Sequence, residues 1–195
     1  MTRLPFSSDA PNTGFSLASP ADMLRKFGWE IRQLTISLGN PSDLANEVGL
    51  TAYRVFNCAV TGWHIAPWTW NCSDGALRAE IAARYRFSSV HQNRRNLERF
   101  CQAVAAECRE LYICRRIANG NHVIVERSDA CVTAHLNGRG SENASYDLKL
   151  DAGGMSRDAE DVFHAAFSYW QRVLTELRFL KRPELCDDEA DGVAR

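Results

Sequence analysis

The sequence predicts a mainly α-helical fold, a helical bundle that carries a small antiparallel three-stranded β insertion before its last long helix. Apolar residues recur every three or four positions over most of the chain, which is the period of an amphipathic helix. The period changes to alternation after residue 121, as in half-buried strands, and the helical spacing returns after residue 156. This order predicts helices that pack against a short meander.

The first predicted helix has well-marked ends. Ser19 is expected to be its N-cap and Pro20 its first residue, and Asp22 follows where the partial positive charge of a helix start stabilises a carboxylate. Gly39 and Pro41 end the helix, because neither residue favours its continuation. Between these ends runs one apolar stripe, which is expected to face the core. The stripe consists of Leu24, Phe27, Ile31, Leu34 and Leu38.

The second predicted helix starts near Ser42 and becomes almost entirely apolar toward its end, so its last turns are expected to cross the core. Pro67 is expected to stop or kink this helix. Near Pro67 lies a group that we call the tryptophan cluster, which forms either a corner of the core or an interface. It consists of Trp63, His64, Trp68 and Trp70. The apolar turns around Trp63 favour the core and predict that Trp63 is almost fully buried.

Two further helices precede the change of period. Ser73 is expected to cap a short helix, and Ser89 is expected to open the next one through a capping box. We expect this longer helix to break once near Glu107. Asn119-Gly120 is typical of a left-handed cap at its C-terminal end.

Three short strands are expected after these helices, at residues 122–126, 131–136 and 146–150. Ser156 is then expected to cap the last long helix. Residues 19–182 are predicted to form a single domain, with the β insertion at about 122–151. Residues 1–18 and the acidic residues 183–195 are expected to be disordered.

The composition argues against several classes of protein. A net charge of −1 is not that of a general polyanion binder, and no signal peptide or long apolar run is present, so a cytoplasmic location without membrane contact is expected. The seven cysteines form no C-x-x-C pair and the five histidines share no ligand spacing, so we expect neither a metal nor another cofactor. Phosphate-binding glycine loops and the G-x-S-x-G and H-E-x-x-H motifs are also absent.

Arginines and a histidine meet at the end of the fourth predicted helix, in the segment from Arg115 to His122. An arginine can hold a phosphate through two hydrogen bonds, and a histidine can transfer protons near neutral pH. Together these side chains suit the cleavage of a phosphodiester. A polar helix terminus without chemical function is the alternative interpretation.

Arg116 and His122, separated by five residues, resemble the R-x4–6-H motif of HEPN-domain ribonucleases, and Arg115 with His122 fits the same spacing. The resemblance implies a helical bundle that forms a homodimer and cleaves RNA without a metal, as part of a toxin or defence system. It also implies roles for single residues. Arg116 would hold the phosphate with Arg115 beside it, His122 would act as acid or base, and Asn119 would orient one of them.

A second match to the HEPN motif consists of Arg86 and His91 and stands just before a predicted helix, as the family motif does. The chain is also similar, over about residues 42–180, to uncharacterised bacterial proteins with a W-H-x-x-x-W helix and an A-N-G-x-K-H turn. Residues 63–68 and 118–122 match these two motifs, except that the lysine before the histidine is missing. This resemblance implies the helix–sheet–helix order and brings no activity.

Positive charge is concentrated between Arg78 and Arg116, where there are nine arginines and four glutamates. Arg95 and Arg99 lie four residues apart on a predicted helix and are expected to share a face that binds RNA. Alternatively, these arginines are solvated or paired with the glutamates. The rival function is a non-catalytic interaction module, antitoxin-like or part of a complex, that contacts a protein partner through the tryptophan cluster.

Overall fold

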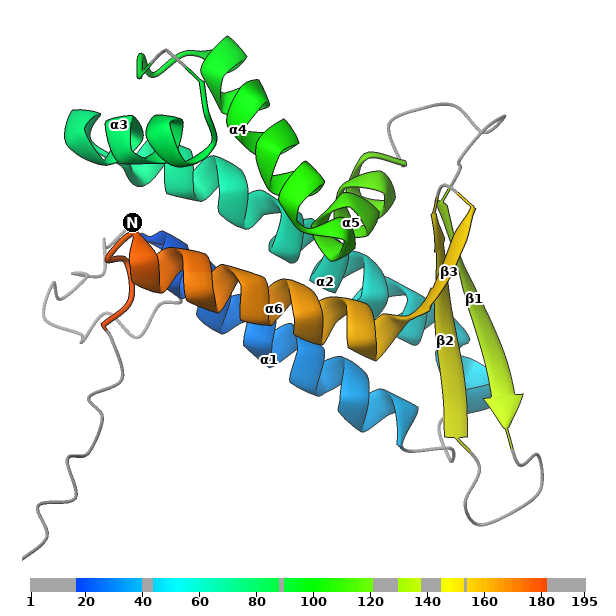
Figure 1. Cartoon of the computed structure of the whole chain (residues 1–195). Helices are drawn as coiled ribbons and strands as arrows, with labels where there is room; N and C mark the ends of the chain where they lie inside the picture. The colour runs from blue at the N-terminus through cyan, green and yellow to red at the C-terminus, as the bar shows by residue number, and fades with distance from the viewer. Residues whose placement is uncertain are drawn as a thin grey trace, which may run out of the picture.

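The computed structural model describes residues 17–39, 44–87, 90–120, 130–137, 145–152 and 154–181. The described residues form six helices and three strands, which Figure 1 shows. In chain order they are α1 (Pro20–Leu38), α2 (Leu44–Cys72), α3 (Gly75–Arg84), α4 (Arg94–Glu107), α5 (Arg109–Gly120), β1 (Ala130–Asn137), β2 (Ser145–Ala152), β3 (Met155–Asp158) and α6 (Ala159–Glu176). The prediction of a mainly helical fold with a small antiparallel sheet before the last helix is confirmed.

Helix α2 lies at the centre of the fold, where it contacts α1, α4, α5 and α6. Helices α1 and α6 run side by side in opposite directions, and α3 and α4 lie across the molecule from α1 (Figure 1). The sheet stands at the end where α6 begins and packs against α5 and α6.

The start of α1 follows the prediction. The Ser19 side chain accepts a hydrogen bond from the backbone N–H of Asp22 at 3.2 Å, and its hydroxyl donates to the Asp22 carboxylate at 2.8 Å. Pro20 occupies the first turn, and Gly39 follows the last helical residue. Every residue of the predicted apolar stripe is buried. The first helix was therefore predictable from its caps and its spacing.

Helix α2 continues through Pro67 to Cys72, so the first of the two predicted outcomes, that Pro67 stops the helix, is wrong, and the second, a kink, stays a prediction. Side-chain bonds support the turns around the proline, since the Thr69 hydroxyl donates to the Ile65 carbonyl at 2.8 Å and the Ser73 hydroxyl donates to the Thr69 carbonyl at 2.6 Å. Trp70 lies beyond the proline and is fully buried. Proline cannot donate a backbone hydrogen bond at this point, and the burial of the Trp70 indole in the core stabilises the turn that follows it.

Two of the predicted caps are corrected by the structure. Asp74, not Ser73, caps α3, and its carboxylate accepts a hydrogen bond from the backbone N–H of Leu77 at 2.8 Å. Asn93 caps α4 and accepts from the backbone N–H of Asn96 at 2.9 Å. The capping box predicted to start at residue 89 is therefore wrong. The predicted break near residue 107 is confirmed, because α4 and α5 are separate helices.

The three strands form one antiparallel sheet in the order β1-β2-β3. In β1 and β2, Ala130 pairs with Ala152 and Asn137 with Ser145, which confirms the strands predicted at 131–136 and 146–150. The strand predicted at 122–126 lies outside the described residues. Strand β3 was not predicted, because Ser156 was expected to cap the last helix. Asp158 is the actual cap and accepts from the backbone N–H of Glu160 at 3.0 Å.

Helices α3 and α6 end in the same unusual way, with an arginine in the left-handed backbone region. Arg86 has a φ of 58° and Arg178 a φ of 62°. In each case the next residue's N–H closes the helix end, Phe87 to Ala82 and Phe179 to Leu174, both at 2.9 Å. Glycine normally occupies such a position, and another residue there costs about 1–2 kcal/mol.

Phe27 is the residue at which α1, α2 and α6 meet. Its ring is fully buried and lies 6.3 Å from the ring of Phe163 and 6.1 Å from the ring of Phe167 on α6. On the α2 side it covers Gly62, where an added Cβ would lie 2.9 Å from Phe27 Cζ. The Gly62 carbonyl also accepts a hydrogen bond from the Trp170 indole at 2.8 Å. Gly62 thus lets three helices approach one another.

A chain of polar side chains connects α3, α4 and α6. The Tyr85 hydroxyl lies 2.9 Å from that of Tyr169, which donates to Glu107 Oε2 at 2.9 Å. Arg84 Nη2 lies 3.2 Å from Glu107 Oε1. Partial burial opposes the ionisation of Glu107, but the hydrogen bond from Tyr169 and the charge of Arg84 outweigh it and lower the Glu107 pKa. Burial raises the pKa of both tyrosines, so both phenols stay protonated.

Gly62→Ala is expected to destabilise the protein. Alanine is usually the better helix residue, but here its methyl group meets the buried Phe27 ring, and overpacking of this kind costs about 1–3 kcal/mol. Urea unfolding gives the change in the free energy of unfolding. Gly75→Ala is the control, because nothing lies within 4 Å of the Cβ it would add. Equal stability of Gly62→Ala and the wild type would show that the helices can separate without cost.

Glu107 is expected to make stability depend on acid. Its pKa is lower in the folded than in the unfolded chain, so its contribution is complete above its unfolded pKa of about 4.3 and is lost as the pH falls through the folded value. Urea unfolding should show that the deficit of Glu107→Gln shrinks between about pH 5 and pH 3. Glu98→Gln, in an exposed pair with Arg94, is the control. A deficit that stays constant over this range would contradict the assignment.

Candidate functional site

The predicted Arg–His site is described only in part. Arg115 and Arg116 lie in α5, and the Arg115 guanidinium lies over the Trp63 ring, 5.4 Å from its centroid. Arg116 is half-buried, and Asn119 is exposed in the last turn of α5. His122 lies outside the described residues. The catalytic pairing of Arg116 with His122 therefore stays a prediction.

The second match to the motif also stays a prediction. Arg86 and His91 are both exposed, and they flank residues 88 and 89, which lie outside the described residues. The backbone carbonyl of His91 accepts a hydrogen bond from the Asn96 side chain at 2.9 Å. This bond gives the His91 backbone a structural role at the start of α4.

The tryptophan cluster belongs mainly to the core. Trp63 is 7% exposed, as predicted, Trp70 is fully buried, and Trp68 is half-buried against the core. His64 is exposed, and its Nδ1 lies 2.7 Å from the Val60 carbonyl oxygen in the preceding turn. The burial of Trp63 and Trp70 leaves neither ring free to contact a protein partner. The alternative interpretation of the cluster as a contact surface is therefore wrong for these two residues.

The predicted basic face is partly neutralised by glutamates. Arg94 Nε lies 2.8 Å from Glu98 Oε1, and Arg84 pairs with Glu107 and Glu176. Arg95 is exposed and Arg99 half-buried, and neither forms an ion pair with a described residue. Arg95 and Arg99 are thus available to an anion.

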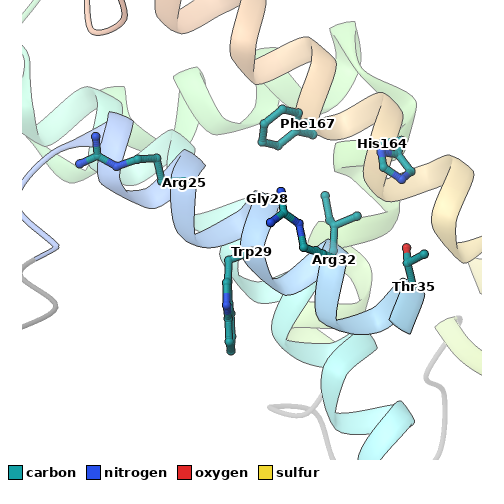
Figure 2. Close-up of a pocket in the computed structure, with 8 residues that line it drawn as sticks. Arg25, Gly28, Trp29, Arg32, Thr35, His164 and Phe167 are labelled. Carbon is teal, nitrogen blue, oxygen red and sulfur yellow. The ribbon is translucent and has the colours of Figure 1, made fainter. Parts of the chain in front are cut away.

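An open groove of about 630 Å³ lies between α1 and α6, where the sequence analysis expected no site. Figure 2 shows its residues, which come from both helices. They are Arg25, Gly28, Trp29, Ile31, Arg32, Thr35, His164 and Phe167. Gly28 brings the helices together at the floor, because an added Cβ would lie 3.0 Å from Phe167 Cε2. The groove therefore has an apolar floor and a polar rim.

The rim carries positive and neutral hydrogen-bonding groups. Arg25 pairs with Asp22, and the Thr35 hydroxyl donates to Glu160. Arg32 and His164 are exposed and form no hydrogen bond or ion pair with the described part of the chain. Figure 2 shows Arg32 on α1 and His164 on α6, on either side of the groove. A guanidinium and an imidazole are thus open to a ligand that lies along the groove.

Trp29 stands out among the five tryptophans, all of which are described. It is 57% exposed, whereas the other four are buried or half-buried. It lies four residues after Arg25 and three residues before Arg32, so the three side chains occupy the same outward face of α1. In Figure 2 the indole extends from α1 on the side away from His164. An exposed indole between two arginines presents an aromatic face to a planar ligand.

Sequence reasoning missed this groove for a physical reason. The apolar stripe of α1 indicates the face that is buried in the core, and Trp29 lies on the opposite face of the same helix. A tryptophan on the polar face of a well-formed amphipathic helix was the available signal. His164 gave no signal, because it joins Arg32 only when α6 packs against α1.

Four of the described cysteines act as packing groups. Cys58, Cys101, Cys108 and Cys114 are buried, and Cys72 is exposed. Burial raises the pKa of the Cys101 thiol to about 12 and that of the Cys108 thiol to about 11, so both stay protonated and unreactive at neutral pH. In the described part of the chain, no group of three or more His, Cys, Asp or Glu residues could hold a metal ion.

The comparisons with known proteins add no family. No family model, curated protein or solved structure matches the chain. No described helix is long and apolar enough to cross a membrane.

Proposed function

We propose that this protein binds single-stranded RNA in the groove between α1 and α6. The observation that carries the proposal is the exposed Trp29, one helical turn from Arg25 and Arg32 on the same face. Proteins bind single strands by stacking bases on aromatic side chains and by holding the backbone with basic ones. A duplex hides its base faces, so an exposed indole favours a single strand.

The groove offers each of these interactions. Stacking on Trp29 would contribute about 1–3 kcal/mol per base, and Arg32 has no protein carboxylate competing for it among the described residues. His164 would donate a hydrogen bond from the opposite wall, and the Thr35 hydroxyl, which donates to Glu160, would accept one at the end of α1. Since the whole chain has a net charge of −1, affinity would depend on these few contacts and not on a general positive field.

RNA cleavage is a second part of the proposal, and it has different support. The HEPN-like motif of Arg116 and His122, with Asn119 and Arg115 beside it, favours a metal-independent ribonuclease of a toxin or defence system. A homodimer and a cytoplasmic location belong to the same proposal. The groove would then hold the RNA, and the end of α5 would supply the cleaving groups. A non-catalytic module that binds RNA or a protein partner is the alternative.

RNA binding can be followed through Trp29, because this is the exposed tryptophan. Adding a single-stranded oligonucleotide is expected to quench the intrinsic fluorescence. With two arginine contacts, the logarithm of affinity should fall with the logarithm of salt concentration with a slope of about −1.4. By anisotropy of a labelled RNA, Trp29→Ala and Arg32→Ala should each weaken binding about tenfold.

The variant Arg95→Ala tests the competing site on α4. Unchanged affinity in Arg95→Ala, together with weaker binding in Arg32→Ala, places the RNA in the groove. The reverse result would place it on α4. No binding by the wild type near 50 mM salt, a concentration at which contacts to phosphates are strong, would remove the proposal altogether.

His122→Ala tests cleavage separately from binding. If His122 is the acid or base, this variant should lose RNA cleavage and keep its melting temperature, because a catalytic imidazole exposed to substrate adds little to packing. His91→Ala is the matched control for the second motif. Unaltered cleavage by purified His122→Ala would rule out this histidine, and a fall of several degrees in melting temperature would identify it as a structural residue.

A further inference from the structure

A second hollow, of about 600 Å³, lies between the end of α3 and the middle of α4. Two arginines and an amide line it, Arg86, Arg99 and Gln102, and the rings of Tyr85 and Phe87 form part of its wall. No carboxylate is among its lining residues. We call it the Arg86–Arg99 pocket. Its polar groups are two cations and an amide that can donate hydrogen bonds.

Neither arginine side chain has an ion-pair or hydrogen-bond partner in the described part of the protein. Arg84 is held by Glu107 and Glu176, and Arg94 by Glu98, but Arg86 and Arg99 form no ion pair or hydrogen bond through their side chains with described residues. An anion that enters the hollow would be attracted by both positive charges and would meet no carboxylate among the lining residues.

The end of α6 shows how an arginine in the backbone conformation of Arg86 can be stabilised. Both Arg86 and Arg178 occupy the left-handed position where glycine is preferred. Arg178 compensates for this strain, because its guanidinium contacts both carboxylate oxygens of Glu80 at 2.9 Å. Arg86 has the same backbone strain and no such carboxylate among the described residues. A bound anion would pair with the Arg86 guanidinium as the Glu80 carboxylate pairs with that of Arg178.

We infer that the Arg86–Arg99 pocket binds a phosphate group, held between its two guanidiniums. A guanidinium matches the geometry of phosphate oxygens through paired N–H donors, and Gln102 adds a neutral donor. The pocket is open, so the phosphate can be free or can be the ester group of a small molecule that extends into solvent. The site lies on α3 and α4, and it does not depend on RNA binding at the α1–α6 groove.

The test is the melting temperature of the full chain, titrated with inorganic phosphate at constant ionic strength. Phosphate is expected to raise the melting temperature by a few degrees and to saturate, since only the folded chain has the site. Arg99→Ala should weaken phosphate binding at least tenfold. Arg86→Gly should melt higher than the wild type without phosphate, because glycine relieves the strain, and should lose the response to phosphate.

Two control variants locate the effect. Arg95→Ala lies one turn from Arg99 outside the pocket, and Arg32→Ala lies in the groove, so both should keep the full response. Ribose 5-phosphate, with ribose as its control, distinguishes the source of the phosphate. Tighter binding of the ester identifies a phosphorylated metabolite, and equal binding identifies free phosphate. The inference is overturned if the wild type gives no saturable shift, if Arg86→Gly and Arg99→Ala respond like the wild type, or if Arg32→Ala loses the response.

Discussion

The packing of Phe27 against two neighbouring helices is the contact on which the rest of the fold depends. Its ring covers Gly62 on α2 and lies beside Phe163 and Phe167 on α6. Because side chains follow the helical period, the inward direction of Phe27 sets the direction of every other side chain of α1. Because Phe27 points inward, its neighbour Gly28 meets α6, and Trp29 is turned outward. The groove and the core are therefore consequences of one helix orientation.

This coupling also explains why the two candidate sites differ in character. The groove has an apolar floor that forms where α1 and α6 approach, so its shape depends on the aromatic core beneath it. The Arg86–Arg99 pocket is formed by one helix end and the helix that follows it in the chain. Its geometry depends on the backbone turn at Arg86. One site is made by tertiary packing and the other by a local turn.

The sequence was informative where one interaction dominates. The spacing of apolar residues outweighs every other signal in α1, and a run of apolar turns placed Trp63 in the core. Caps were missed where two residues compete at similar energy, as with Ser73 and Asp74, and the choice depends on the Ser73 bond to the Thr69 carbonyl. Pro67 was misleading because the helix beyond it is held by the Thr69 bond to the Ile65 carbonyl and by the burial of Trp70, which a sequence pattern does not show. The groove could not be predicted, because His164 meets α1 only in the folded chain.

The hydrogen bond between the Trp170 indole and the Gly62 carbonyl joins residues that are 108 positions apart in the chain. A contact between residues so far apart in the sequence cannot form while synthesis has reached only α5. Until α6 has left the ribosome, Phe27 lacks the rings of Phe163 and Phe167, and the Gly62 carbonyl lacks the Trp170 indole. Contacts between distant segments also slow the search for the native fold. The nascent chain must therefore keep these apolar residues from aggregating until α6 has been synthesised, and α6 is the helix that completes this part of the core.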